Sequence, residues 1–173
     1  MAQNKLSVQS SGSGSAATQP GAVCDVRLEV RKLRPLVPIS FCSILFDKEF
    51  DAVAADCESG FFRFSFDISS RMGGRRELRI LRDCVLHRLN PNYPEPKSLP
   101  DVFDLLLPKR DIRSTELARV LACEKNHVHK LKSNFVITRG PLQADGPNSF
   151  SVFSRASIVK FLRLRAGGDP SAN

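Results

Sequence analysis

Hydrophobic and polar residues alternate along several stretches in the first half of the chain. Over residues 26–30 every second position is apolar and the positions between are charged, which predicts a half-buried strand. Residues 39–46 form a short apolar run rich in aromatic and branched side chains, for which we also expect a strand. Residues 61–68 predict a further strand with one apolar face, formed by Phe62, Phe64, Phe66 and Ile68.

The spacing of apolar residues changes after the turn sequence 71–74. Residues 75–89 carry apolar side chains at helical intervals, which predicts an amphipathic helix with Leu78, Leu81, Val85, Leu86 and Leu89 on one face. We expect its opposite face, with Arg75, Arg79 and Arg82, to be solvated, and a phosphate-contacting stripe is the alternative. Residues 24–90 are therefore predicted to be a small α+β domain that serves dimerisation or sensing.

Proline divides the chain. Residues 91–100 contain four prolines, which lack an amide donor and restrict the preceding residue, so we expect a linker and a domain boundary there. Residues 1–23 and 167–173 are expected to be tails, because the first of them is rich in serine and glycine and has few large apolar residues.

Two short helices are predicted over residues 114–132, after another short helix at 101–107. Two helices that cross at a steep angle need an apolar stripe, a small residue at the crossing and a compact turn. The first helix offers Leu117, Ala118 and Leu121; the turn offers Ala122 and Cys123; the second helix returns Val128 and Leu131. The pattern predicts a helix-turn-helix whose second helix is 124–132.

Residues 134–154 contain two short β segments around glycine and proline turns, which predicts a hairpin or wing. Its strands would contain Phe135, Val136 and Ile137, and Phe150, Val152 and Phe153. A closing helix is expected over residues 155–165, capped by Ser154, with Ile158, Val159, Phe161 and Leu162 facing the core.

The order of these motifs, S-T-E-L-A-x-x-L-x-C followed by V-x-x-L, a β wing and S-R-A-S-I-V-x-F-L, resembles the excisionase and MerR-type winged helix-turn-helix family over residues 110–165. The resemblance implies an α+β fold with a C-terminal winged helix-turn-helix domain, 101–166. It also implies that the second helix enters the major groove of DNA and that the 140–149 loop touches the adjacent backbone or the minor groove. The expected DNA-binding residues are Lys125, Asn126, His129, Lys130, Lys132, Arg139, Ser114 and Thr115. One departure is Ala122, at a turn position that usually holds glycine.

Charge agrees with this interpretation. The net charge is +8, and residues 101–167 hold 12 basic and 6 acidic groups, against 13 and 11 in residues 24–100. A basic domain attracts polyanions, nucleic acid first among them. We expect double-stranded DNA as the partner and a homodimer, because one such module buries little surface. A transcriptional regulator is the leading hypothesis; a recombination directionality factor that bends DNA, or a protein–protein interaction module, are the alternatives.

Other chemistry has weaker support in the sequence. No catalytic motif, phosphate-binding glycine loop or paired carboxylates appear, so we expect no enzyme activity, no cofactor, no small-molecule ligand and no metal. The five cysteines lie 15 to 39 residues apart without a C-x-x-C pair, which favours buried, reduced thiols. No apolar run is long enough to span a bilayer, so we expect a cytoplasmic, nucleoid-associated protein that does not enter membranes.

Overall fold

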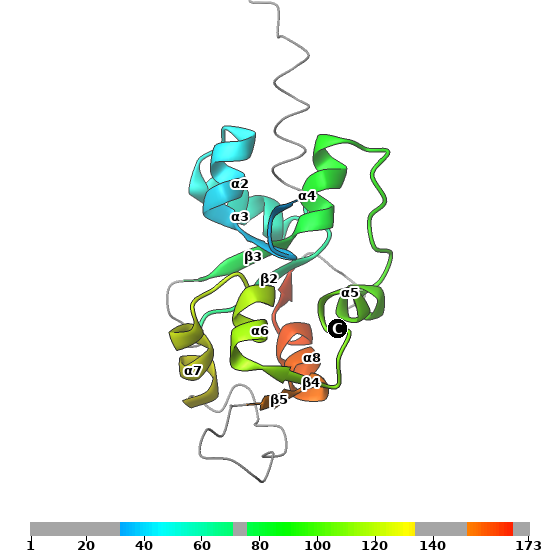
Figure 1. The fold of residues 1–173 in the computed structure, drawn as a ribbon. Coiled ribbons are helices and arrows are strands. Elements are labelled where there is room, and N and C mark those ends of the chain that lie inside the picture. The colour runs from blue at the N-terminus through cyan, green and yellow to red at the C-terminus, as the bar shows by residue number, and fades with distance from the viewer. Residues whose placement is uncertain (1–31, 71–75, 134–151, 168–173) are drawn as a thin grey trace, which may run out of the picture.

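The computed structural model describes residues 32–70, 76–133 and 152–167. Within these ranges the chain is a mixed α+β structure with seven helices and two small antiparallel sheets (Figure 1). The mixed class predicted from the sequence is therefore confirmed. Figure 1 shows α2, α3 and α4 on one side of the larger sheet and α6, α7 and α8 on the other.

The larger sheet has four strands in the order β1-β3-β2-β6. Their bounds are Leu36–Pro38 for β1, Ser65–Asp67 for β2, Leu78–Leu81 for β3 and Ala166–Gly167 for β6. All three pairings are antiparallel, and Ser65 lies opposite both Ile80 and Gly167. The last strand of the described chain thus completes a sheet built from its first half. Gly167 belongs to this sheet, so the expectation that the C-terminal tail begins there is wrong.

The strand expected over residues 39–46 is a helix. The helix α2, Ile39–Phe46, begins directly after β1 and packs against α3, Phe50–Glu58, a helix that the sequence did not suggest. Asp47 ends α2 in the left-handed conformation, with φ of 50°. An apolar run of eight residues fits a strand and a buried helix turn equally well, so tertiary packing decided the outcome.

The helix expected over residues 75–89 is also partly wrong. Residues 78–81 form β3, and the helix α4 covers only Arg82–Leu89. Leu78 and Ile80 are buried on the central strand, where β1 and β2 pair on either side. Arg79 and Arg82 are half-buried rather than fully solvated, and Arg75 lies outside the described residues.

The apolar face predicted over residues 61–68 is confirmed, since Phe62, Phe64, Phe66 and Ile68 are all buried. Only residues 65–67 of this stretch pair as a strand. Phe66 lies near Phe103, with ring centroids 6.5 Å apart, and so joins the sheet to the second half of the chain. The buried hydrophobic cluster draws on residues from both sides of the proline-rich segment. Of the linker predicted over residues 91–100, residues 91–98 form neither helix nor strand, as expected, but Leu99 and Pro100 already belong to the helix Leu99–Leu106.

The second half has the element order helix, strand, helix, helix, strand, helix before β6. The bounds are Leu99–Leu106 for α5, Asp111–Arg113 for β4, Ser114–Val120 for α6, Lys125–Ser133 for α7, Val152–Ser154 for β5 and Arg155–Arg163 for α8. Ser154 caps α8 through its side chain, which accepts a hydrogen bond from the Ser157 backbone N–H, as predicted.

The strand β5 pairs antiparallel with β4, and Ile112 lies opposite Phe153. The sequence did not suggest β4. The predicted wing strand at 135–137 and the loop at 140–149 lie outside the described residues.

Candidate nucleic-acid interface

The helices α6 and α7 pack against each other through the residues that the sequence pattern selected. The side chains of Leu117, Ala118 and Leu121 are buried on the α6 side, and Val128 and Leu131 are buried on the α7 side. These contacts fix one face of α7 against the core. The remaining faces of α7 are available for other contacts.

The turn between the two helices depends on Ala122, which has a φ of 50°. This left-handed conformation brings the Cys123 N–H to 3.0 Å from the Ala118 carbonyl oxygen, which closes the end of α6. The winged helix-turn-helix pattern that residues 110–165 resemble usually has glycine at this position. Ala122 adopts the conformation that glycine would adopt, and its Cβ makes that conformation more costly.

The predicted DNA-binding residues of α7 have different exposures. Lys125, Asn126 and Lys130 are exposed, whereas His129 and Lys132 are half-buried. Thr115, at the start of α6, is exposed. Ser114 is buried, with 5% of its surface accessible. DNA could hardly reach its side chain, and we remove Ser114 from the candidate interface. Arg139 lies outside the described residues.

His127 attaches α7 to the larger sheet. Its Nε2 atom lies 2.7 Å from the carbonyl oxygen of Ile68, just beyond β2, and its Nδ1 atom lies 3.6 Å from a carboxylate oxygen of Glu77, just before β3. A carbonyl oxygen only accepts hydrogen bonds, so Nε2 carries the hydrogen and donates it. The side chain is 12% exposed.

Arg79 makes a second connection from the sheet to the helix-turn-helix. Its Nε atom donates to the carbonyl oxygen of Leu121, the C-cap residue directly after α6, at 3.2 Å, and a neighbouring guanidinium nitrogen lies 3.9 Å from a Glu77 carboxylate oxygen. Burial lowers the pKa of Arg79, although the Glu77 carboxylate works in the opposite direction. The Arg79 hydrogen bond gives a partner to the Leu121 carbonyl oxygen, which belongs to the carbonyl groups at a helix end that have none within the helix.

Sequence reasoning missed this joint between Glu77, Arg79 and His127 because residues 75–89 were assigned to a helix. The alternation of apolar Leu78 and Ile80 with Glu77 and Arg79 could have indicated the strand β3, although not its contact with His127.

A polar concavity of about 520 Å³ opens beside this joint. Its walls include Asn126 and Lys130 from α7, and Arg34, Glu77 and Arg79 from the sheet side. Asn126 and Lys130 thus line a concave surface while staying exposed. Among the residues that the structure describes, Lys125, Asn126 and Lys130 of α7 stay exposed, which a DNA-binding helix requires.

The small sheet β4–β5 is held by α5 and α8. Arg155, the first residue of α8, donates from Nε to the carbonyl oxygen of Leu107 at 2.8 Å and forms an ion pair with Asp104. Its backbone N–H donates to the Arg110 carbonyl oxygen at 2.8 Å. These bonds place the chain that returns from residues 134–151 beside the strand that precedes α6.

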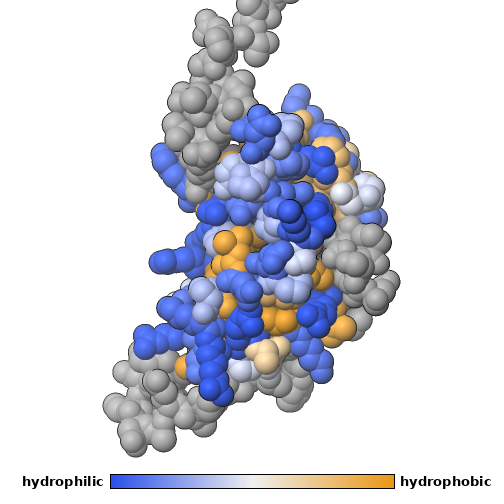
Figure 2. All heavy atoms as spheres, turned by 90° about the vertical axis from the view of Figure 1, so that its right-hand side faces the viewer, coloured by the Kyte–Doolittle hydropathy of each residue, from blue (hydrophilic) through white to orange (hydrophobic). Residues whose placement is uncertain are grey.

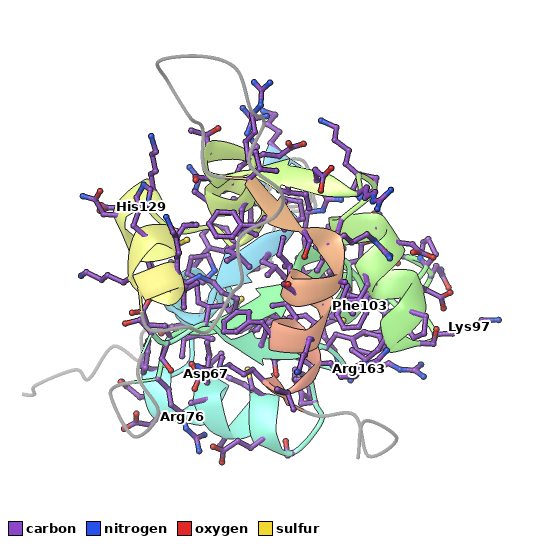
Figure 3. The ribbon with its side chains drawn as sticks, turned by 90° about the horizontal axis from the view of Figure 1, so that it is seen from below. Asp67, Arg76, Lys97, Phe103, His129 and Arg163 are labelled. Atoms are coloured by element: carbon purple, nitrogen blue, oxygen red, sulfur yellow. The ribbon has the colours of Figure 1, made fainter. Side chains whose placement is uncertain are left out.

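Figure 3 labels His129 on α7 at the opposite side of the molecule from Lys97 and Arg163. Figure 2 shows a face with α4 and α5, where hydrophilic side chains surround small apolar patches. Because Lys97 is exposed and distant from α7, it is a useful reference for experiments on the candidate interface.

Cysteines 42, 57 and 84 are buried free thiols, as predicted, and Cys123 is a half-buried one. Burial raises the pKa of Cys57 to about 11 and that of Cys42 to about 12. Cys24 lies outside the described residues. Among residues that the structure describes, no three histidine, cysteine or acidic side chains gather as metal ligands. The same part of the chain contains no helix with the length and apolar character needed to cross a bilayer.

Protein-family models, curated proteins and solved structures were each compared with the chain, and none of them matches it.

Proposed function

We propose that the protein binds double-stranded DNA through α7, as a sequence-specific regulator of transcription. The observation that carries the proposal is the division of α7 into two faces. Val128, Leu131 and His127 hold the helix to the protein, while Lys125 and Asn126 face outward. A helix fixed in this way presents a defined polar surface to a partner.

The chemistry of the outward surface suits a base-reading helix. The major groove of B-DNA is about 12 Å wide and admits an α-helix. The Asn126 carboxamide can both donate to and accept from adenine, and Lys125 and Lys130 can reach guanine or a phosphate oxygen. Asn126 lies in the first turn of α7, the part of a recognition helix that meets base edges.

The element order around α7 supports a winged helix-turn-helix arrangement. A strand precedes α6, and the strand that follows α7 returns to pair with it, as β4 and β5 do. The pairing places Val152, where the described part of the chain resumes after α7, opposite Arg113, directly before α6. This is where the resemblance expects a wing, with Arg139 as its phosphate contact.

The charge of this half favours phosphate binding. Residues 101–167 hold twice as many basic as acidic groups. Lysine and arginine side chains that neutralise phosphates release counterions, so affinity for DNA should fall steeply as salt rises. A partner protein recognised through apolar contacts would show a much weaker dependence.

Selection from a random duplex pool, followed by fluorescence anisotropy at two salt concentrations, tests the proposal. We expect a preferred site and an affinity that falls at least tenfold between about 50 and 200 mM salt. Lys125→Ala should reduce the salt slope by about 1, because one phosphate contact is lost. Lys97→Ala, which removes an exposed lysine far from α7, is the matched control and should leave the slope unchanged.

If the pool yields no enriched sequence and affinity is independent of salt, the proposal is wrong. The outward face of α7 would then be a surface for another protein.

A further inference from the structure

The helix α2 exposes a large apolar side chain on the side that faces away from the sheet. None of its eight residues is charged, and Ile44 is 83% exposed, next to the exposed Ser40 on the same face. Ile39 and Cys42 on the opposite side are buried. An exposed aliphatic residue beside an apolar groove marks a candidate surface for another molecule.

An apolar groove of about 300 Å³ lies between the first half of α2, β1 and the turn that follows α6. Its walls include Phe41 of α2, Val37 and Pro38 of β1, and Ala122 of the turn. Phe41 lies one helical turn before Ile44, so the groove and the protruding isoleucine are neighbours on one face of the helix. The surface therefore has both a protruding apolar side chain, Ile44, and an apolar groove that fits such a side chain.

Charges flank this surface in a definite order. Arg34 is exposed and lines the groove, at the N-terminal end of α2. Asp47 and Glu49 are exposed at the C-terminal end, beyond Ile44. Lys48, which lies between them, is engaged in an ion pair with Asp56 at 2.6 Å and does not neutralise them. From the N-terminal to the C-terminal end of α2, the surface thus presents basic Arg34, the apolar groove, the protruding Ile44, and then the acidic Asp47 and Glu49.

We propose that a second copy of this chain docks on the α2 surface, with the two α2 helices antiparallel about a twofold axis. Ile44 of each copy enters the groove beside Phe41 of the other. Asp47 and Glu49 of each copy face Arg34 of the other. A twofold contact requires that every feature have its complement on the same surface, in reversed order, and the order along α2 meets this requirement.

The choice of a second copy rests on this self-complementarity. Two chains with a net charge of +8 repel each other over most of their surfaces. The α2 surface joins an uncharged centre to ends of opposite sign, so a copy can approach there without like charges meeting. Arg34 and Ala122 line both this groove and the concavity beside α7, so the contact is tested without DNA.

Sedimentation velocity over a range of protein concentrations tests the proposal. We expect the full chain to show a concentration-dependent monomer–dimer equilibrium. Ile44→Glu places a charge at the centre of both halves of the contact and should raise the dimer dissociation constant by more than about 100-fold. Leu164→Glu is the matched control, because Leu164 is 78% exposed and ends α8, on the other side of the larger sheet from α2 (Figure 1). It should change the dissociation constant less than about threefold.

Charge reversal tests the orientation of the two helices. Arg34→Glu and Glu49→Arg should each weaken the dimer, and the double variant should recover most of the loss, because the pair is restored with its signs exchanged. Failure of the double variant to recover would overturn the antiparallel arrangement.

A wild-type protein that stays monomeric at all concentrations would overturn the proposal and leave the groove to residues 1–31 of the same chain or to another protein. A dimer that survives Ile44→Glu would also overturn it. Either result leaves the DNA-binding proposal to its own test.

Discussion

The imidazole Nε2 atom of His127 lies 2.7 Å from the carbonyl oxygen of Ile68, so α7 is hydrogen-bonded to the chain as it leaves β2. The two residues are 59 positions apart in the sequence. This contact, with the Glu77 carboxylate at the other ring nitrogen, fixes the orientation of the helix that we propose reads DNA.

Replacing His127 with alanine should destabilise the protein. The substitution removes the donor to a carbonyl oxygen in a half-buried position, which typically costs about 1–3 kcal/mol of unfolding free energy. Urea denaturation measures the change. His129→Ala, two residues further along α7, is the control and should cost less than about 1 kcal/mol. Equal losses for the two variants would mean that the Ile68 contact does not hold α7.

Ala122→Gly should stabilise the protein. Ala122 has a φ of 50°, and the left-handed conformation costs a residue with a Cβ roughly 1–2 kcal/mol. Part of this gain is offset by the larger entropy of glycine in the unfolded chain, so we expect a net gain of about 0.5–1 kcal/mol. The same substitution at Ala118, inside α6, should instead destabilise by about 1 kcal/mol or more. Thermal and urea unfolding of both variants check the opposite signs.

The α6–α7 packing and the cap of α8 show what the sequence could predict. The contacts between α6 and α7 follow from local spacing, and residues such as Leu117 and Val128 are buried as expected. The Ser154 cap is local too, since it joins residues three positions apart. Short-range signals of this kind are contained in a few neighbouring residues, which is why the α6–α7 contacts and the cap of α8 could be predicted.

The larger sheet was not predictable in the same way. Its central strand β3 is set by pairing with β1, about 40 residues earlier, and with β2, and the apolar spacing of residues 78–89 fits a helix as well. The pairing of Ser65 with Gly167 joins positions that no local pattern relates. The contacts of His127 and Arg79 depend on that sheet, so sequence reasoning could not place them.

Gly167→Ala should destabilise the protein because there is no room for a side chain. A Cβ at this position would lie 2.9 Å from the Ser65 Oγ atom on the paired strand, and overpacking of this kind costs about 1–3 kcal/mol. Ser65→Ala removes that oxygen, so the double variant should recover most of the loss. A double-mutant cycle measured by urea denaturation gives the coupling. Additive losses would show that β6 does not pack on Ser65.

The unfolding free energy should fall at alkaline pH through the buried thiols. Burial raises the pKa of Cys57 from 9.0 to about 11, so the folded state keeps a proton that the unfolded state loses. The stabilisation is present in full below pH 9 and is lost progressively as pH rises from 9 to about 11. Cys57→Ala should remove on the order of 2 kcal/mol of this pH dependence.

Lysine side chains also titrate in this range, so the measured quantity is the difference between the wild-type and Cys57→Ala curves. A difference that stays constant from pH 8 to about 11 would contradict the assigned shift.

The affinity of Asn126→Ala for a selected duplex and for a scrambled duplex of the same length, measured side by side, tests the central claim most directly. If α7 reads bases, the substitution should weaken binding to the selected site by about 1–3 kcal/mol and leave binding to the scrambled duplex unchanged. Unchanged binding to both duplexes, or an equal loss on both, would contradict a base-reading role for this helix.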